Sequence, residues 1–247
     1  MSITPIIPKR GINDEGKGKK FALHKLISAA GTDYVWLQDD DVIVPHRAPE
    51  TQADLLILPL KMEAGDLSLL ERLQKAEYAA IQQITIQTAQ QGKPVMCSGA
   101  NLIVRRDRWL ESWPDLHPEI PSGDDMFLLE SFKRRGLKIE TLDDDRYTAV
   151  VHPHKSWQSF FKQRMRWAGK APHYTDRDIV RYGALVLGLN ILQILCPLII
   201  VVKFPYEYSL IKKRDASVSL VDAFILELLY PFYMLICIIG GLFRRAW

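Results

Sequence analysis

Two apolar stretches near the C-terminal end of this 247-residue chain limit its possible folds more than any other feature. Residues 183–202 contain no charged side chain, and about 20 such residues span ~30 Å of hydrocarbon as a helix. Residues 220–243 carry Asp222 and Glu227 near their start and are uncharged from Leu228 onward. Because charges inside a membrane span are costly, we expect this second helix to begin at the membrane surface and insert from Leu228.

The topology of these two stretches has three interpretations. If both span and residues 1–175 are cytosolic, Lys212, Lys213 and Arg214 face outward, against the tendency of basic residues to remain inside. A hairpin that enters the membrane without crossing it removes this conflict. Two buried helices of a soluble bundle are the third interpretation. We predict a membrane hairpin, and the sequence does not decide whether it crosses the bilayer. Pro197 is expected to kink its first helix.

Composition excludes several other classes of protein. The hydrophobic share of 48% is too high for a disordered chain, and the net charge of +3 excludes a histone-like polycation or an acidic tail. The three cysteines are far apart, so neither a disulfide framework nor a zinc knuckle is expected. Nucleic-acid binding is not expected, because the basic residues gather near the apolar stretches rather than on a separate face.

Residues 1–175 have the pattern of a soluble α/β protein. Helices alternate with short apolar strands, which indicates a layered α/β sheet. Residues 16–31 are predicted to form a Gly/Lys-rich turn followed by a helix that ends before Gly31. The other predicted helices are 67–90 with Asp66 as its cap, and 124–135 with Gly136 past its end; the predicted strands are 34–37, 55–60, 95–97, 102–104 and 137–141. We therefore expect a domain over 1–150, an interfacial segment over 151–175 and a membrane hairpin over 176–247.

An acidic triplet, Asp39-Asp40-Asp41, directly follows the predicted strand 34–37. Open α/β sheets bind their ligands at the carboxyl ends of strands. Hard carboxylate oxygens suit Mg²⁺ or Mn²⁺, which nucleotide-dependent enzymes hold with one or two carboxylates and substrate phosphates. A solvated turn is the alternative interpretation of this triplet.

A second acidic pair, Asp124-Asp125, opens the predicted helix 124–135. Carboxylates at a helix N-terminus are stabilised by its dipole, so Asp124 is expected to be an N-cap. Asp125, one position further, is a candidate general base for an acceptor hydroxyl.

The third group is Gln163-Arg164-Met165-Arg166-Trp167, on an amphipathic stretch that begins at Ser156. Its aromatic and basic residues are typical of a helix lying on lipid headgroups. An arginine can also stabilise a diphosphate leaving group, and a tryptophan face can carry a sugar ring.

Together and in this order, these motifs resemble the family-2 glycosyltransferases, which include cellulose, chitin and hyaluronan synthases. The motifs that carry the resemblance are Gly18-Lys19-Lys20-Phe21-Ala22-Leu23 (G-K-x-x-A-L), Asp39-Asp40-Asp41 (D-x-D), Ser98-Gly99-Ala100-Asn101 followed by Arg105-Arg106, Gly123-Asp124-Asp125 (T-E-D or E-D), and Gln163 to Trp167 (Q-x-x-R-W). The resemblance covers residues 10–175 in detail and the C-terminal part in architecture.

The resemblance implies a partial GT-A sheet with helices on both faces, followed by an interfacial helix and a transmembrane hairpin. It implies that Asp39 and Asp41 hold a divalent cation, and that Lys19, Asn101 and Asp39 contact the substrate. Asp125 would be the catalytic base, with Asp124 as the alternative carboxylate. Gln163, Arg166 and Trp167 would line the acceptor and diphosphate side.

The function implied is that of a multi-pass enzyme of the inner or plasma membrane with its catalytic domain on the cytoplasmic side. It would move a sugar from a nucleotide-diphosphate sugar, expected to be a UDP-sugar, to a glycan or lipid hydroxyl with inversion, in polysaccharide biosynthesis. Mg²⁺ or Mn²⁺ is the expected cofactor, and membrane lipids are expected partners.

Two other functions compete with this one. The family's first strands, which hold the uracil and ribose, have no counterpart before the G-K-x-x-A-L motif, and residues 3–7 resemble only a later strand. A truncated, non-catalytic remnant that acts as a membrane partner is therefore the alternative. Phosphoryl transfer is the weaker one, because Gly16-Lys17-Gly18-Lys19 lacks the spacing of a phosphate-binding loop.

Overall fold

The computed structural model describes residues 2–9, 18–63, 68–120 and 122–243. The chain forms two compact units. The first comprises residues 1–60 and 85–151, and the second comprises residues 61–84 and 152–246. Helix α2 (Leu69–Gln90) contributes residues to both units.

The first unit is built on a mixed five-stranded sheet in the order β1-β2-β5-β3-β6. Its strands are β1 (Ile3–Ile6), β2 (Tyr34–Gln38), β3 (Leu55–Ile57), β5 (Asn101–Arg105) and β6 (Ile139–Thr141). Strand β5 is antiparallel to both β2 and β3, whereas β1 runs parallel to β2 and β6 parallel to β3. Two further strands, β4 (Leu60–Met62) and β7 (Ala149–Val151), form a two-stranded sheet. The predicted mixed α/β class is confirmed.

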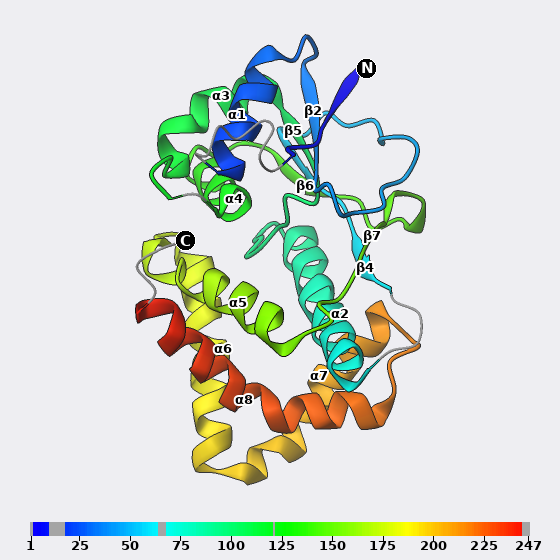
Figure 1. Ribbon diagram of the computed structural model, residues 1–247, viewed down its shortest axis with the longest axis vertical. Coiled ribbons are helices and arrows are strands. Elements are labelled where there is room, and N and C mark those ends of the chain that lie inside the picture. Colours follow the sequence, from blue (N-terminus) through cyan, green and yellow to red (C-terminus); the bar gives the residue numbers. More distant parts are fainter. Residues whose placement is uncertain (1, 10–17, 64–67, 121, 244–247) are drawn as a thin grey trace. The chain divides into compact units, whose positions relative to one another are not determined.

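Both faces of the five-stranded sheet are covered. Helices α1 (Lys19–Ala29), α3 (Arg106–Ser112) and α4 (Asp124–Arg134) pack together on one face (Figure 1). On the other face Trp36 joins a buried cluster with Ile103, and Tyr147 from the short helix η2 (Asp145–Tyr147) packs against it. Side chains alternate along a strand, so the fully buried neighbours of Trp36 point to the helical face.

The local predictions for this unit differ from the structure at three places. Residues 95–97 form no strand, because the Val95 N–H bonds to the Thr88 hydroxyl at 3.4 Å and these residues extend past the end of α2 outside the sheet. The predicted run 55–60 is divided between β3 and β4. The predicted cap Asp66 lies outside the described residues, and Ser68 caps α2 through a reciprocal pair of hydrogen bonds with Glu71.

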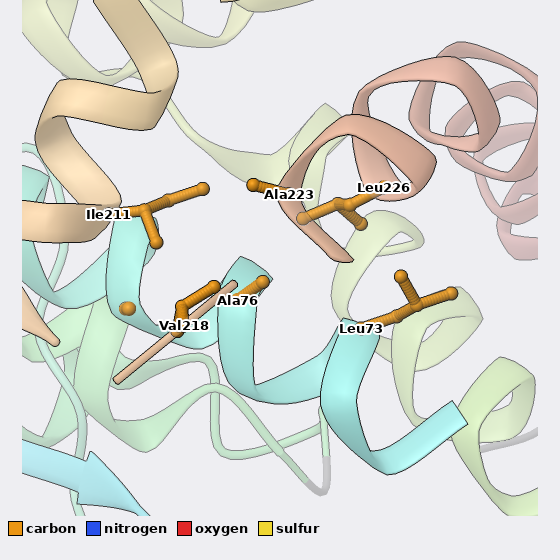
Figure 2. Close-up of a cluster of buried hydrophobic side chains, with 7 residues drawn as sticks. Leu73, Ala76, Ile211, Val218, Ala223 and Leu226 are labelled. Atoms are coloured by element: carbon orange, nitrogen blue, oxygen red, sulfur yellow. The ribbon is translucent and has the colours of Figure 1, made fainter. Parts of the chain in front are cut away.

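The second unit consists of helices. Besides the first part of α2 it contains α5 (Trp157–Ala168), η3 (Ala171–His173), α6 (Arg177–Leu195), η4 (Pro197–Ile199), α7 (Ile200–Arg214) and α8 (Leu220–Phe243). Its buried core joins one face of α2 to the end of α7 and the start of α8 (Figure 2). The core residues are Leu73, Ala76, Ala79, Ile211, Val218, Ala223 and Leu226.

Helices α6 and α8 are long and apolar enough to cross a membrane. The second predicted stretch, 220–243, coincides with α8. The first, 183–202, is not one helix, because α6 ends at Leu195 and a new helical segment starts at Pro197. Proline disfavours helical backbone at the residue before it, and Cys196 accordingly has φ −134° and ψ 84°.

Both acidic residues of α8 are paired with cations inside this unit. Lys212, Lys213 and Arg214, expected in a loop, form the last turn of α7. In α8, the Glu227 carboxylate accepts a hydrogen bond from Lys203 of α7 at 2.7 Å, and both side chains are buried. Near the start of α8, Asp222 pairs with Arg72 of α2 at 2.9 Å. Pairing on a protein-facing side offsets the cost of placing these carboxylates in an apolar helix.

Candidate functional site

Four of the predicted motifs meet at one end of the sheet in the first unit. The ammonium of Lys19, at the start of α1, lies 2.5 Å from Asp39, which follows β2. The same ammonium lies 3.7 Å from Asp124, the first residue of α4. Partial burial lowers the pKa of Lys19, but the carboxylates of Asp124 and Asp39 raise it more, so the net pKa is above its ordinary value. Lys19 is therefore a permanent cation among these carboxylates at neutral pH.

Strand pairing explains why these residues meet. Gln38, the last residue of β2, is opposite Asn101, the first residue of β5, so the loop before β5 lies beside the end of β2. In that loop, a side chain added to Gly99 would meet Asp124 at 3.0 Å and Lys19 at 3.6 Å. Only glycine allows the loop to approach the charged groups this closely without displacing them.

The two carboxylates of α4 differ in surroundings. Gly123, with φ 84°, is the N-cap position, so the prediction that Asp124 caps the helix is wrong. Asp124 is instead the buried first helical residue. Asp125 is half-buried, and its carboxylate accepts hydrogen bonds from its neighbour Met126 at 2.8 Å and from the Gly99 N–H at 3.3 Å. These bonds fix the Asp125 carboxylate while leaving it partly accessible.

Asn101 is fully buried at the end of the sheet, and its side chain has no surface open to solvent. Its side-chain oxygen accepts a hydrogen bond from Trp36, and its amide donates to the carbonyls of Pro59 and Tyr147, each at 2.9 Å. Asn101 thus joins three segments behind the charged cluster. The substrate contact expected of it stays a prediction.

The donor set at the end of β2 suits a divalent cation by its chemistry. Asp39 is half-buried, Asp40 and Asp41 are exposed, and all three offer hard oxygen ligands. Among the described residues, no three acidic, histidine or cysteine side chains gather closely enough to form a complete metal site. A cation at Asp39 and Asp41 would therefore take its remaining ligands from substrate or water, and it would compete with Lys19 for Asp39.

The fifth motif lies on α5, in the second unit. Arg166 and Trp167 are exposed and Gln163 is half-buried, so all three have surface available for a ligand. Ser156 caps this helix by accepting a hydrogen bond from the Ser159 N–H at 3.2 Å. The interfacial position expected for this segment stays a prediction.

Arg164, inside this motif, is a residue whose importance the sequence reasoning missed. It is buried and pairs with Glu77 of α2 at 2.6 Å, and Tyr233 of α8 donates a hydrogen bond to the same carboxylate. Arg164 also donates to the Gln163 side chain at 2.5 Å, and its guanidinium lies 4.3 Å from the centre of the Trp167 ring. Burial lowers the pKa of Arg164, but Glu77 raises it more, so the group stays charged.

One sequence signal could have identified this pair. Glu77 lies four positions after Leu73 and seven after Leu70, on a buried face of α2. A carboxylate at such a position requires a buried cation as its partner. The order of residues does not reveal which cation, because the partner follows 87 positions later.

Open α/β sheets bind their ligands at the carboxyl ends of strands, and the cluster of Lys19, Asp39 and Asp124 lies at such an end. Residues 8–170, well over half of the chain, match the family described as glycosyltransferase like family 2. The chain therefore belongs to this family. No curated protein matches it significantly.

Proposed function

We propose that this protein is a membrane-bound inverting glycosyltransferase that uses a nucleotide-diphosphate sugar, in particular a UDP-sugar, and a glycan or lipid acceptor. The observation that carries the proposal is the cluster of Lys19, Asp39, Gly99, Asp124 and Asp125 at the strand ends. Membership of the family supports sugar transfer. The cluster combines a cation suited to phosphates with a partly accessible carboxylate suited to a hydroxyl.

Asp125 is the proposed general base. Its carboxylate takes the proton of the acceptor hydroxyl while the hydroxyl oxygen forms a bond to the anomeric carbon. The bond between that carbon and the diphosphate oxygen breaks, and the nucleoside diphosphate leaves with the electron pair. A single displacement of this kind inverts the anomeric centre. Asp124 is the less suitable base, because it is buried and lies near the Lys19 ammonium.

Lys19 supports departure of the diphosphate from the donor side. Its protonated ammonium supplies a positive charge where negative charge develops on the leaving group. Asp39 and Asp41 would hold Mg²⁺ or Mn²⁺, which when bound neutralises diphosphate charge. Because Asp39 pairs with Lys19, binding of the donor is expected to redistribute Lys19 from the carboxylate to the phosphates.

Gln163, Arg166 and Trp167 are the proposed acceptor and diphosphate contacts. Arg164 holds Gln163 by a hydrogen bond and lies against one face of the Trp167 ring. The other face of the ring is the proposed platform for a sugar. The apolar helices α6 and α8 support membrane attachment of the chain.

The experiment that tests the donor site is a calorimetric titration of UDP into the full chain in detergent with Mn²⁺. It is repeated with EDTA and with Asp39→Ala/Asp41→Ala, and Asp33→Asn, an exposed change at the opposite end of β2, is the control. We expect binding that EDTA and the double substitution abolish and that the control keeps. If the folded chain binds no UDP, the proposed donor site is refuted and the non-catalytic alternative is favoured.

A further inference from the structure

We propose that Lys20 is a positioning residue for sugar transfer, which holds the start of α1 and the start of α4 in one fixed arrangement. The inference rests on the proposed function and deepens it, because it names a residue that acts through Asp125 without contacting a substrate. The motif that opens α1 contains two lysines in succession. Lys19 faces the charged cluster, whereas Lys20 is turned into the interior of the first unit.

Lys20 is a buried cation, with only 1% of its surface exposed. The residues that share its side of α1 are also buried, and they are apolar: Ala22, Leu23 and Ile27. Successive residues of a helix point about 100° apart, so Lys20 does not follow the direction of Lys19. Burial of an ammonium group is costly unless polar partners surround it. The partners of Lys20 therefore indicate what this side chain does.

The ammonium of Lys20 donates hydrogen bonds to two backbone carbonyls at the end of helix η1 (Trp113–Leu116). One acceptor is the Leu116 carbonyl, and the other is the His117 carbonyl at 2.9 Å. His117 has a left-handed backbone conformation with φ 52°, which is uncommon for a residue other than glycine. Lys20 thus caps η1 from another helix and holds the turn that follows it.

The same ammonium also lies against α4. It is 4.9 Å from the centre of the Phe127 ring, and the His117 ring is 4.7 Å from the same ring. Phe127 is buried and follows Asp125 by two positions in the first turn of α4. Its N–H donates to the Gly123 carbonyl at 3.1 Å and closes that turn. A shift of Phe127 would therefore move Asp125 with it.

These contacts connect the donor side of the candidate site with its proposed base. Lys19 lies 2.5 Å from Asp39, and it reaches Asp124 of α4 at a longer distance, 3.7 Å. The proposed binding of the donor draws Lys19 toward the phosphates. Lys20 keeps α1 and α4 in contact while Lys19 changes partners. The position matters for the rate, because a catalytic group displaced by about 1 Å can cost 10²-fold.

The test is a double-mutant cycle of Lys20→Met and Asp125→Asn in the full chain in detergent. Methionine keeps an unbranched apolar side chain and removes the ammonium group. Initial rates are measured with radiolabelled UDP-glucose, UDP-galactose and UDP-N-acetylglucosamine, with a membrane extract as the source of acceptor. The Kd for UDP with Mn²⁺ and the number of UDP-binding sites come from calorimetry. Lys25→Met, at an exposed position of the same helix, is the matched control.

We expect Lys20→Met to lower the transfer rate per UDP-binding site by about 10²-fold. The Kd for UDP should change little, because Lys19 and Asp39 keep their own contact. Lys25→Met should keep both the rate and the Kd. In the Asp125→Asn background, Lys20→Met should lower the rate little further, because the group that it positions is already lost.

The same loss of rate from Lys20→Met in both backgrounds would mean that Lys20 acts independently of Asp125, and it would overturn the inference while leaving the proposed function intact. An unchanged rate in Lys20→Met would overturn it as well. Absence of transfer by the unsubstituted chain would refute the proposed function and this inference with it.

Unfolded protein does not enter the comparison, because rates are expressed per UDP-binding site. Lys20→Gln replaces Lys20→Met if that variant unfolds at the assay temperature, since its neutral amide can still donate a hydrogen bond. The same non-additive loss is expected of Lys20→Gln, because glutamine is shorter than lysine and carries no charge. Loss of UDP binding in both variants would assign Lys20 to the folding of α1 and would overturn the positioning role.

Discussion

Asp125 is held by the backbone of its own helix and of the Gly99 loop, so its carboxylate has a defined position before any acceptor arrives. Its neighbour Asp124 faces the Lys19 ammonium instead. Two adjacent carboxylates therefore have different surroundings, one near a cation and one partly accessible, and the proposed function gives them different roles. The roles can be separated by substituting each residue singly.

Asp125→Asn is expected to lower the transfer rate by about 10²–10⁴-fold, the usual contribution of a general base. The asparagine oxygen can still accept one of the two backbone hydrogen bonds, and Asp125 is not among the proposed donor contacts, so UDP binding should change little. Initial rates with a radiolabelled UDP-sugar and the calorimetric UDP titration measure the two effects. A parallel loss of UDP binding would assign Asp125 to the structure of the helix start.

Arg164 and Glu77 show how a buried ion pair can position a surface motif. Glu77→Gln leaves the Arg164 charge without its counter-ion, and we expect a loss of about 3–5 kcal/mol in stability. Arg166→Met, on the exposed side of the same helix, should change stability by no more than about 0.5 kcal/mol. Thermal unfolding in detergent measures both.

The double variant Glu77→Gln/Arg164→Met separates positioning from packing. An apolar replacement of a buried pair is often neutral for stability, so we expect the thermal midpoint to recover while sugar transfer remains impaired. If transfer recovers together with the midpoint, Arg164 does not position Gln163 and Trp167.

At the scale of elements, the C-terminal half of α4 is held by hydrogen bonds and ion pairs far from Asp124 and Asp125. Asp115, in helix η1 (Trp113–Leu116), accepts hydrogen bonds from Ser131 and Arg135 at 2.7 Å and pairs with Arg134 at 2.7 Å. Partial burial raises the pKa of Asp115, but the Arg135 and Ser131 hydrogen bonds and the arginine charges lower it more, so its folded-state pKa is below its ordinary value. The brace therefore depends on an ionised carboxylate.

Asp115→Asn is expected to destabilise the fold at pH 7 by on the order of 1 kcal/mol, about 2–4 °C in thermal midpoint. Because the folded pKa lies below the unfolded one, the wild-type advantage is complete above the unfolded pKa. It is lost as the pH falls through the folded pKa. Thermal scans at pH 7 and pH 3 should show the two proteins converging at acid pH. An unchanged difference at both pH values would contradict the role of ionisation.

The contact between α5 and α8 depends on a pair of glycines with different neighbours. A side chain at Gly241 would lie 2.8 Å from backbone atoms of Met165 and Gly169, at the end of α5, whereas the nearest atoms to one at Gly240 belong to the flexible Met165 side chain. Gly241→Ala should therefore lower stability by about 1–3 kcal/mol, as overpacking does. Gly240→Ala should cost less, because Met165 can move. Equal thermal midpoints for the two variants would mean that α5 and α8 do not pack this closely.

At the scale of the whole molecule, the proposed membrane attachment can be tested on α6, which is exposed on most of its circumference. Leu185→Asp/Leu192→Asp places two charges in its exposed apolar surface, at about 2.5–3.5 kcal/mol each. We expect the fraction of protein in carbonate-washed membranes to fall at least about tenfold. Ala216→Asp, in the exposed connection before α8, should leave that fraction unchanged. Retention of the double variant would show that α6 is not the inserted helix.

The sequence by itself determined the α/β class, most of the elements and four motifs of the candidate site. Periodicity, capping residues and apolar length are local properties, so they predict β2, α4 and α8 without knowledge of the fold. The motif order also led to the family, which the match over residues 8–170 confirms. The break of the first apolar stretch at Pro197 was less predictable, because membrane helices tolerate proline and only the surrounding packing decides between a kink and an end.

The tertiary structure decided which charges meet. Lys19 lies against both Asp39 and Asp124. Arg164 pairs with Glu77, which lies 87 positions earlier in the sequence. Such pairings depend on strand register and helix packing, which bring distant residues within a few ångströms, and no local pattern encodes those distances. The strength of a buried pair also depends on its exclusion from water, and that exclusion exists only once the helices have packed.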